Sequence, residues 1–268
     1  MTDLDILEAV LKNLGGGAIA VSGGVDSMTL ATVAGHIPNT NFEMFHALSP
    51  AVPAHATARV RDFAKREGWR LREIIAGEFD DPSYRANPVN RCFYCKTNLY
   101  GTVSAHTNKT VLSGTNTDDL SDYRPGLDAA RDHDVCHPYV EAGISKAGVR
   151  AIARYLSLID LADLPAAPCL SSRVETGLRI ESNQLTFIDA VEKYVARHIS
   201  AHTVRCRIRK NEVAIELEAG ALQALEQATA NHLRDVIENM MRTESIAKPL
   251  SFKLYRMGSA FLHKAVDG

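Results

Sequence analysis

A glycine-rich hexapeptide, Ser22-Gly23-Gly24-Val25-Asp26-Ser27, follows a short apolar run at 18–21 and precedes a helical pattern. Its two glycines carry no Cβ, so a polyphosphate can approach the backbone closely, and the helix that follows offers unpaired amide groups. The serine hydroxyls could donate further hydrogen bonds, and Asp26 could hold Mg²⁺ on the phosphates. Because the loop lacks the lysine of the Walker pattern, the residues favour cleavage of ATP to AMP and pyrophosphate over γ-phosphate transfer. The alternative is a glycine turn that only joins a strand to a helix.

A second polar segment, Ser113-Gly114-Thr115-Asn116-Thr117-Asp118-Asp119, closes another predicted strand. Its hydroxyls and two carboxylates suit a metal-bound phosphate or a ribose. In a parallel sheet, ligands gather beyond the carboxyl ends of the strands, so both segments should face one site. The alternative is an ordinary Asx turn, because Asn and Asp favour turns for backbone reasons. We take four residues as candidate nucleotide contacts here: Gly114, Thr115, Asp118 and Asp119.

A C-x-x-C pair, Cys92 and Cys95, lies where a loop is expected to enter a helix, between Arg91 and Lys96. Helix amides and neighbouring cations favour the thiolate form of cysteine. The pair could be two inert core thiols, a redox dithiol or two ligands of a metal centre.

A third cysteine, Cys169, precedes Arg173, whose guanidinium suits the binding of anions. Three thiolates without a fourth would leave one iron of a [4Fe-4S] cluster open to an external ligand such as sulfide. Zinc is the alternative, because three thiolates with His106 or His137 would complete a tetrahedral site. The other two cysteines, Cys136 and Cys206, are expected to be buried apolar residues.

The apolar pattern alternates between strands and helices over the first part of the chain and predicts an α/β fold with a parallel sheet. Prolines at 165 and 168 break the helical pattern, so we place a domain boundary near Asp163, giving domains 1–163 and 164–268. The second domain is expected to be a small α+β domain. The expected strands are 18–21, 42–48, 71–75 and 110–113 in the first domain and 203–209, 212–218 and 251–255 in the second. The helices that matter below are expected at 54–67, 96–106, 182–198 and over 222–240.

Composition narrows the function classes. Thirty basic against thirty-two acidic residues give a formal net charge of −2, so nucleic acid is not an expected partner. The first fifteen residues are unlike a signal peptide, and no apolar run approaches the roughly 20 residues that span a bilayer. We therefore expect a cytoplasmic protein with reduced thiols and no membrane partner.

Taken together, these blocks make the chain resemble the ATP-dependent sulfur transferases of the LarE family, within the PP-loop ATP pyrophosphatases. The resemblance spans nearly the whole chain. Besides the two loops and the cysteine segments, it includes Asp122-Tyr123-Arg124-Pro125-Gly126-Leu127, Val140-Glu141-Ala142-Gly143, Pro165 to Arg173, and Tyr255-Arg256-Met257-Gly258-Ser259.

The resemblance implies that ATP adenylates a carboxylate of a pyridinium dicarboxylate mononucleotide, and that a sulfur nucleophile then displaces AMP. Cys169 matches the family's sulfur-donor cysteine. Members that also carry the C-x-x-C pair are thought to hold a [4Fe-4S] cluster on three cysteines, which implies Cys92, Cys95 and Cys169 here. Members with the single cysteine sacrifice its sulfur, and that chemistry is the alternative.

The family resemblance also implies that two alternating arginines bind the substrate phosphate, and Arg205 and Arg207 stand at the matching positions. It further implies that the protein is a homo-oligomer and that a separate sulfur donor provides its sulfur. Lys193 stands in the region where an acidic metal-site residue is expected, with Glu192 beside it. Two other functions are compatible with the loop: a PP-loop tRNA thiolase, and a non-enzymatic protein that uses ATP or an iron–sulfur centre as a signal.

Overall fold

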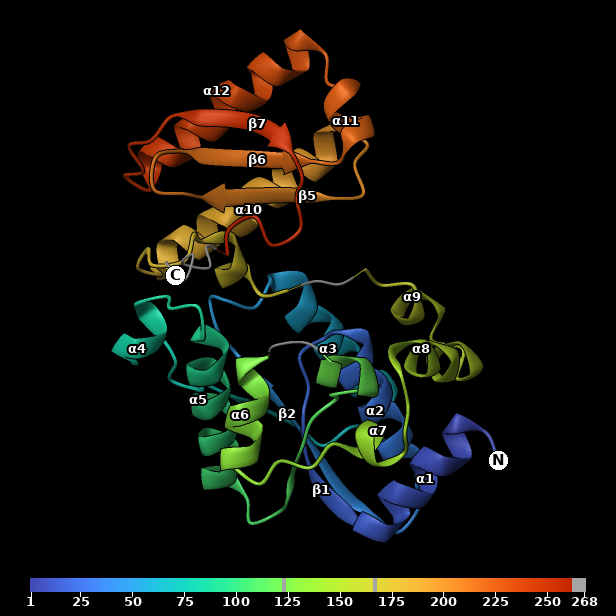
Figure 1. Ribbon diagram of the computed structural model, residues 1–268. Helices are drawn as coiled ribbons and strands as arrows, with labels where there is room; N and C mark the ends of the chain where they lie inside the picture. The colour runs from blue at the N-terminus through green and yellow to red at the C-terminus, as the bar shows by residue number, and fades with distance from the viewer. Residues whose placement is uncertain (122–123, 166–167, 262–268) are drawn as a thin grey trace. The chain divides into compact units, whose positions relative to one another are not determined.

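The computed structural model describes residues 1–121, 124–165 and 168–261 (Figure 1). The chain forms two compact units, one of Met1–Asp81 with Asn90–Ala167 and one of Pro82–Val89 with Pro168–Gly268. The sequence pattern puts the division near Asp163 and does not set apart the segment 82–89. That short segment matters below because it carries a tyrosine that contacts the turn after Cys169.

The first unit contains a four-stranded sheet in the order β3-β2-β1-β4, and all neighbouring strands are parallel. The predicted α/β class is therefore confirmed, and each strand begins and ends within two residues of its predicted place. The strands are β1 (Gly16–Ala20), β2 (Asn41–Ala47), β3 (Leu71–Ile74) and β4 (Val111–Leu112).

Helices cover both faces of this sheet because the strands bury side chains in both directions. Ala18 and Ala20 of β1 belong to a cluster with Tyr100, whereas Ile19 belongs to the cluster around Met28. Helices α5 (Arg91–His106) and α6 (Pro125–Asp132) contribute to the first cluster. The second is built by α1 (Asp3–Leu14), α2 (Val25–His36), α3 (Ala54–Arg66), α8 (Lys146–Tyr155) and α9 (Ile159–Ala162).

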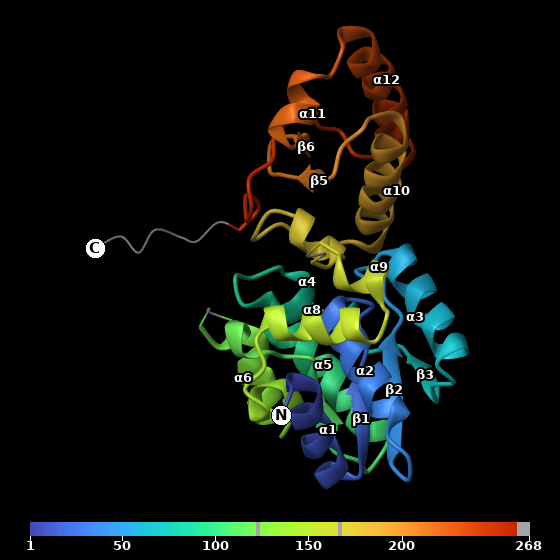
Figure 2. The same ribbon diagram turned by 90° about the vertical axis from the view of Figure 1, so that its right-hand side faces the viewer.

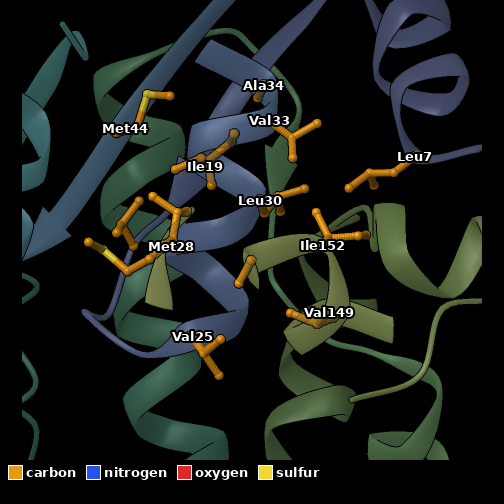
Figure 3. Packing of buried hydrophobic residues seen from close by; sticks show 14 of the residues in the cluster. Leu7, Ile19, Val25, Met28, Leu30, Val33, Ala34, Met44, Val149 and Ile152 are labelled. Carbon is orange, nitrogen blue, oxygen red and sulfur yellow. The ribbon is translucent and has the colours of Figure 1, made fainter. Parts of the chain in front are cut away.

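Helix α2 is apolar around most of its circumference, since it lies between the sheet and the outer helices. Figure 3 shows its side chains between Ile19 and Met44 of the strands and Leu7 and Ile152 of α1 and α8. This packing fixes the start of α2, and with it the loop that leads into the helix. The short elements α7 (Pro138–Glu141) and a 3₁₀ turn, η1 (Thr117–Ser121), complete the unit.

Helix α5 begins five residues earlier than predicted, at Arg91 instead of 96. The buried side of the helix already includes Arg91, which is 3% exposed, and continues to Tyr100 and Val103. The expectation of a loop at Cys92 and Cys95 was therefore wrong, because burial extends the helix through both residues.

The second unit is the predicted small α+β domain. Its sheet has the order β5-β6-β7, with β5 antiparallel and β7 parallel to β6. Helices α10 and α12 pack together on one face of it (Figure 2). The bounds are α4 (Pro82–Arg85), η2 (Leu170–Arg173), α10 (Ser182–His198), β5 (Val204–Ile208), β6 (Val213–Leu217), α11 (Ala219–Gln223), α12 (Gln227–Thr243) and β7 (Leu250–Leu254).

The single helix expected over 222–240 is two helices. Glu226, the N-cap of α12, has an extended backbone (φ −64°, ψ 146°), so the helix is interrupted between α11 and α12. The apolar spacing on the two sides of the break is similar, which is why the pattern alone predicted continuity.

The longest helices of the described ranges, α10 and α12, have 17 residues each and carry charged side chains. No helix in these ranges combines the length and the apolar character that crossing a bilayer requires.

Candidate functional site

The predicted phosphate loop, residues 22–27, joins β1 to α2 in a conformation that requires glycine at Gly23. This residue has a φ of +84°, and a Cβ placed on it would lie 2.9 Å from the carbonyl oxygen of Ala56 in α3. Gly24 is the N-cap of α2 and makes no side-chain cap hydrogen bond. The first amides of α2 are thus left to an external acceptor such as a phosphate.

Hydroxyl groups brace the loop from inside. The amide of Ser22 donates to Oγ of Ser27 at 3.0 Å, and the two serine hydroxyls are 3.1 Å apart. Oγ of Ser27 also lies 3.4 Å from the carbonyl oxygen of Gly24. Val25 contributes its backbone only, because its side chain is 4% exposed and packs in the core (Figure 3).

The second predicted segment lies directly against the first. A Cβ on Gly114 would be 2.8 Å from the amide nitrogen of Ser27 and 2.9 Å from the carbonyl carbon of Asp26, so only glycine allows this approach. Nδ2 of Asn116 is 3.4 Å from Oδ1 of Asp26. The two loops meet at the carboxyl ends of β1 and β4, which are neighbours in the sheet.

The remaining residues of the second loop hold its shape. Oγ1 of Thr115 is 2.9 Å from Oγ of Ser113. Asp119 accepts from the amide of Asn116 at 3.1 Å and pairs with Arg124 at 2.7 Å. Asp118 accepts from the amide of Lys146 at 3.2 Å. Of the resembling block 122–127, Asp122 and Tyr123 lie outside the described residues.

Lys146 is a site residue that sequence reasoning missed. Its Nζ contacts Oδ2 of Asp26 at 2.5 Å, although 120 residues separate the two in sequence. Ser145 caps α8 by accepting from the amide of Gly148 at 3.3 Å, which places Lys146 at the first helical position. The serine could have predicted the helix start, but no local signal points to Asp26 as the partner.

His137 and Cys136 lie beside the second loop and are already engaged. Nδ1 of His137 is 2.8 Å from Oγ of Ser113, and burial lowers the pKa of this histidine. The Cys136 thiol donates to Glu141 at 2.8 Å. Burial, together with the Glu141 carboxylate, raises the pKa of Cys136 to about 12, so this thiol stays protonated at neutral pH. The zinc alternative also named His106, whose Nδ1 is 2.8 Å from the Thr102 carbonyl oxygen.

Cys92 and Cys95 lie in the first turn of α5, where a spacing of three places them on the same side of a helix. Cys92 is exposed and Cys95 is half-buried. Both belong to the first compact unit, whereas Cys169 belongs to the second. Within the described ranges, no group of three or more His, Cys, Asp or Glu side chains is close enough to hold a metal ion.

Cys169 is the N-cap of η2, and its carbonyl group is heavily hydrogen-bonded. It accepts from the Ser172 amide at 3.0 Å, the Ser172 hydroxyl at 2.7 Å and the Arg173 guanidinium at 3.0 Å. Tyr84 of α4 adds a contact of 2.6 Å to Oγ of Ser171. The thiol therefore extends from a turn that is held at several points. Ala166 and Ala167 of the segment before it lie outside the described residues.

Arg173 is buried and paired. It is 3% exposed and donates to both oxygens of Glu192, at 3.0 and 3.1 Å. Glu192 also accepts from the amide of Cys206 at 3.0 Å. Cys206 is fully buried, as predicted for an apolar core residue, and burial raises the pKa of its thiol.

Arg205 and Arg207 share one face of β5, but their surroundings differ. Arg207 is 4% exposed and donates to Glu216 at 3.0 Å and to the Ser172 carbonyl oxygen at 2.9 Å. Arg205 donates to the Val204 carbonyl oxygen at 2.8 Å and lies over the Tyr255 ring, 5.9 Å from its centroid. Burial and the neighbouring Arg173 lower the pKa of Arg205.

Three curated proteins are similar to this chain, while no family model matches it. It is 33% identical over 259 residues to the uncharacterized protein slr1717 of Synechocystis, covering 95% of both chains. It is 28% identical over 204 residues to the uncharacterized protein MJ0830 of Methanocaldococcus jannaschii, covering 75% of this chain and 77% of the relative. Over 216 residues it is 27% identical to pyridinium-3,5-bisthiocarboxylic acid mononucleotide synthase of Lactiplantibacillus plantarum, covering 79% and 78%.

Proposed function

This chain belongs to the same protein family as slr1717 of Synechocystis, and from that premise we propose that it is an ATP-dependent sulfur transferase of the LarE type. Its substrate is a pyridinium dicarboxylate mononucleotide, of which one carboxylate becomes a thiocarboxylate for the nickel-pincer nucleotide. The name of the Lactiplantibacillus relative supports this substrate class. The contact between the two loops at Asp26 supports the ATP-dependent step.

In the first step a carboxylate oxygen of the substrate attacks the α-phosphorus of ATP, and pyrophosphate leaves. The amides at the start of α2 and the Ser22 and Ser27 hydroxyls hold the phosphates. Asp26 would hold Mg²⁺ on them, and Lys146, which pairs with Asp26 in the structure, would turn its ammonium group to the leaving pyrophosphate. Lys146 thus supplies the charge that the hexapeptide lacks.

In the second step a sulfur nucleophile attacks the acyl carbon, and AMP leaves with the electrons of the acyl–oxygen bond. Cys92, Cys95 and Cys169 would hold a [4Fe-4S] cluster, which supplies a transferable sulfide when bound. Two of these cysteines are three residues apart near the start of α5, and the third is the N-cap of η2 in the hydrogen-bonded turn. A separate sulfur donor restores the sulfide.

Sacrificial transfer is the second candidate for the sulfur step, because Cys169 is present in both versions of the chemistry. The Cys169 thiolate would attack the acyl adenylate, and β-elimination would leave its sulfur on the product and dehydroalanine in the chain. A PP-loop tRNA thiolase is less well supported, since a net charge of −2 offers no general attraction to RNA.

We assign the substrate phosphate to Arg205, whose described partners include no carboxylate. Arg173 and Arg207 instead stabilise the turn at Cys169. Arg173 donates to the carbonyl oxygen of Cys169, and Arg207 donates to the carbonyl oxygen of Ser172. We also propose that the protein works as a homo-oligomer in the cytoplasm.

The deciding experiment combines the dicarboxylate nucleotide with ATP, Mg²⁺ and anaerobically purified protein. We expect AMP, pyrophosphate and thiocarboxylate product over several turnovers, from protein that contains iron and labile sulfide. A single turnover with loss of one H₂S from the intact mass would select the sacrificial version. Pyrophosphate release that depends on tRNA, or no release with either substrate, would reject the proposal.

A further inference from the structure

Arg59 of α3 reaches the outer side of the phosphate loop. Its guanidinium donates to the carbonyl oxygen of Gly23 at 2.7 Å. In the described ranges this carbonyl is its hydrogen-bonding partner, and no carboxylate pairs with it. Burial lowers the pKa of Arg59, and no neighbouring charge offsets that effect. A partly buried cation without a counter-ion is costly, so its presence at an anion-binding loop calls for a reason.

Arg61, two residues further along α3, shows the ordinary arrangement. Its guanidinium is half-exposed and donates to both oxygens of Glu73, at 2.6 and 3.0 Å. The same helix therefore carries one arginine whose charge is compensated within the protein and one whose charge is not. The uncompensated one is the arginine that contacts the phosphate loop.

The contact with Gly23 sets the direction of a loop amide. In a trans peptide the carbonyl group and the following amide group point in opposite directions. Holding the Gly23 carbonyl toward α3 therefore turns the Gly24 amide away from α3. That amide is only weakly used within the protein, because its nearest acceptor, Oγ of Ser22, is 3.4 Å away. The φ of +84° at Gly23 lets the peptide adopt this orientation.

We propose that Arg59 is a positioning residue for the pyrophosphate part of ATP. By holding the Gly23 carbonyl, it presents the Gly24 amide to the phosphates, and its uncompensated charge makes the loop prefer a polyphosphate to a monophosphate. The assignment rests on the proposed adenylation, because it concerns the group that leaves in that step. Ala56 of α3 also approaches this loop closely, since a Cβ placed on Gly23 would lie 3.1 Å from the Cβ of Ala56.

The test compares Arg59→Gln, Arg59→Lys and the matched control Arg61→Gln. Calorimetry would measure binding of Mg²⁺–ATP, pyrophosphate and AMP to each full-length protein, at low and at moderate salt. We expect Arg59→Gln to lower the affinity for ATP and for pyrophosphate about ten- to hundredfold, which is the range of a lost charge-assisted hydrogen bond. The affinity for AMP should fall less than twofold. Arg59→Lys should recover part of the loss because it keeps the charge. Arg61→Gln should bind all three as the parent does.

The outcomes separate this inference from the proposed function. If the parent protein binds no ATP, the adenylation proposal is wrong, and the role assigned to Arg59 is wrong as well. If the parent binds ATP and Arg59→Gln binds it equally well, only the assignment of Arg59 is wrong. Equal losses for AMP and ATP, with no recovery in Arg59→Lys, would show that Arg59 serves the fold alone and would also overturn the assignment.

Discussion

The phosphate loop and the arginine cluster around β5, the two proposed anion sites, differ in the donors that they offer. The loop offers backbone amides and hydroxyls, and its charged residues are few: Asp26, Lys146 and Arg59. The cluster in the second unit consists of Arg173, Arg205, Arg207 and Arg209, and carboxylates already neutralise three of these four cations. Arg173 is paired with Glu192, and Arg207 and Arg209 share Glu216. The number of arginines in a region is therefore a poor guide to its affinity for phosphate.

The buried carboxylate of Glu216 shows that charges in the second region are paired within the protein. It is 1% exposed and accepts from Arg207 at 3.0 Å, from Arg209 at 2.6 Å and from the Ser259 hydroxyl at 2.7 Å. Asp26 is more exposed and has a neighbour, Lys146, that can turn elsewhere. Both carboxylates pair with cations of the protein. Glu216 stabilises the fold, whereas Asp26 is the carboxylate that we propose as a ligand-binding group. Replacing each of them tests this difference.

The largest effect is expected from Asp26→Ala. Removing the proposed Mg²⁺ ligand should lower kcat/KM for pyrophosphate release about a thousandfold, since a bound metal contributes several kcal/mol to the transition state. The Asp26–Lys146 pair is partly exposed and contributes little to stability, so urea unfolding should change by less than about 1 kcal/mol. Activity near that of the parent would contradict the role of the loop.

Glu216→Gln should mainly lower stability, in contrast to Asp26→Ala, which should mainly lower activity. Removing the charge leaves two guanidinium groups without their counter-ion, one of them fully buried, and breaking such a pair typically costs about 3 kcal/mol of unfolding free energy. Urea denaturation measures the loss. Ser259→Ala is the matched control, because it removes a neutral partner of the same carboxylate and should cost about 1 kcal/mol. Unchanged stability in Glu216→Gln would remove the contrast between the two regions.

Lys146→Met should reduce pyrophosphate release about tenfold to a hundredfold, a smaller effect than at Asp26, because the loop amides and Mg²⁺ remain. Methionine keeps the length of the side chain, and the Lys146 amide can still donate to Asp118. Arg154 of the same helix pairs with Asp163 on the surface, so Arg154→Met serves as the control. Steady-state kinetics with the dicarboxylate nucleotide would refute the assignment if both variants matched the parent.

The sequence predicted the loop region better than the arginine cluster, for a physical reason. Backbone binding needs glycines and a strand–helix junction, which are local signals, and the parallel-sheet rule brings Gly114 to Asp26. Arg173 and Arg207 are buried against Glu192 and Glu216, which lie 19 and 9 residues further along the chain. In the sequence these two glutamates resemble any surface glutamate. Lys146 was missed because its partner, Asp26, is 120 residues away in sequence. The early start of α5 was missed because a charged residue, Arg91, forms part of the buried face.

The smallest effect concerns pH and the histidine that supports the loop. His46 is 1% exposed and contacts the Val21 carbonyl oxygen at 2.8 Å and Oγ1 of Thr57 at 2.9 Å. Burial lowers the pKa of His46 in the folded state. As pH falls below about 6.5, the unfolded chain therefore binds a proton more readily than the folded one, and stability is lost.

On lowering the pH from 7.5 to 5.5, the denaturant midpoint should fall by less than Glu216→Gln lowers it. His46→Gln should show a smaller pH-dependent change than the parent. Equal pH dependence in the two proteins would mean that His46 does not carry this effect.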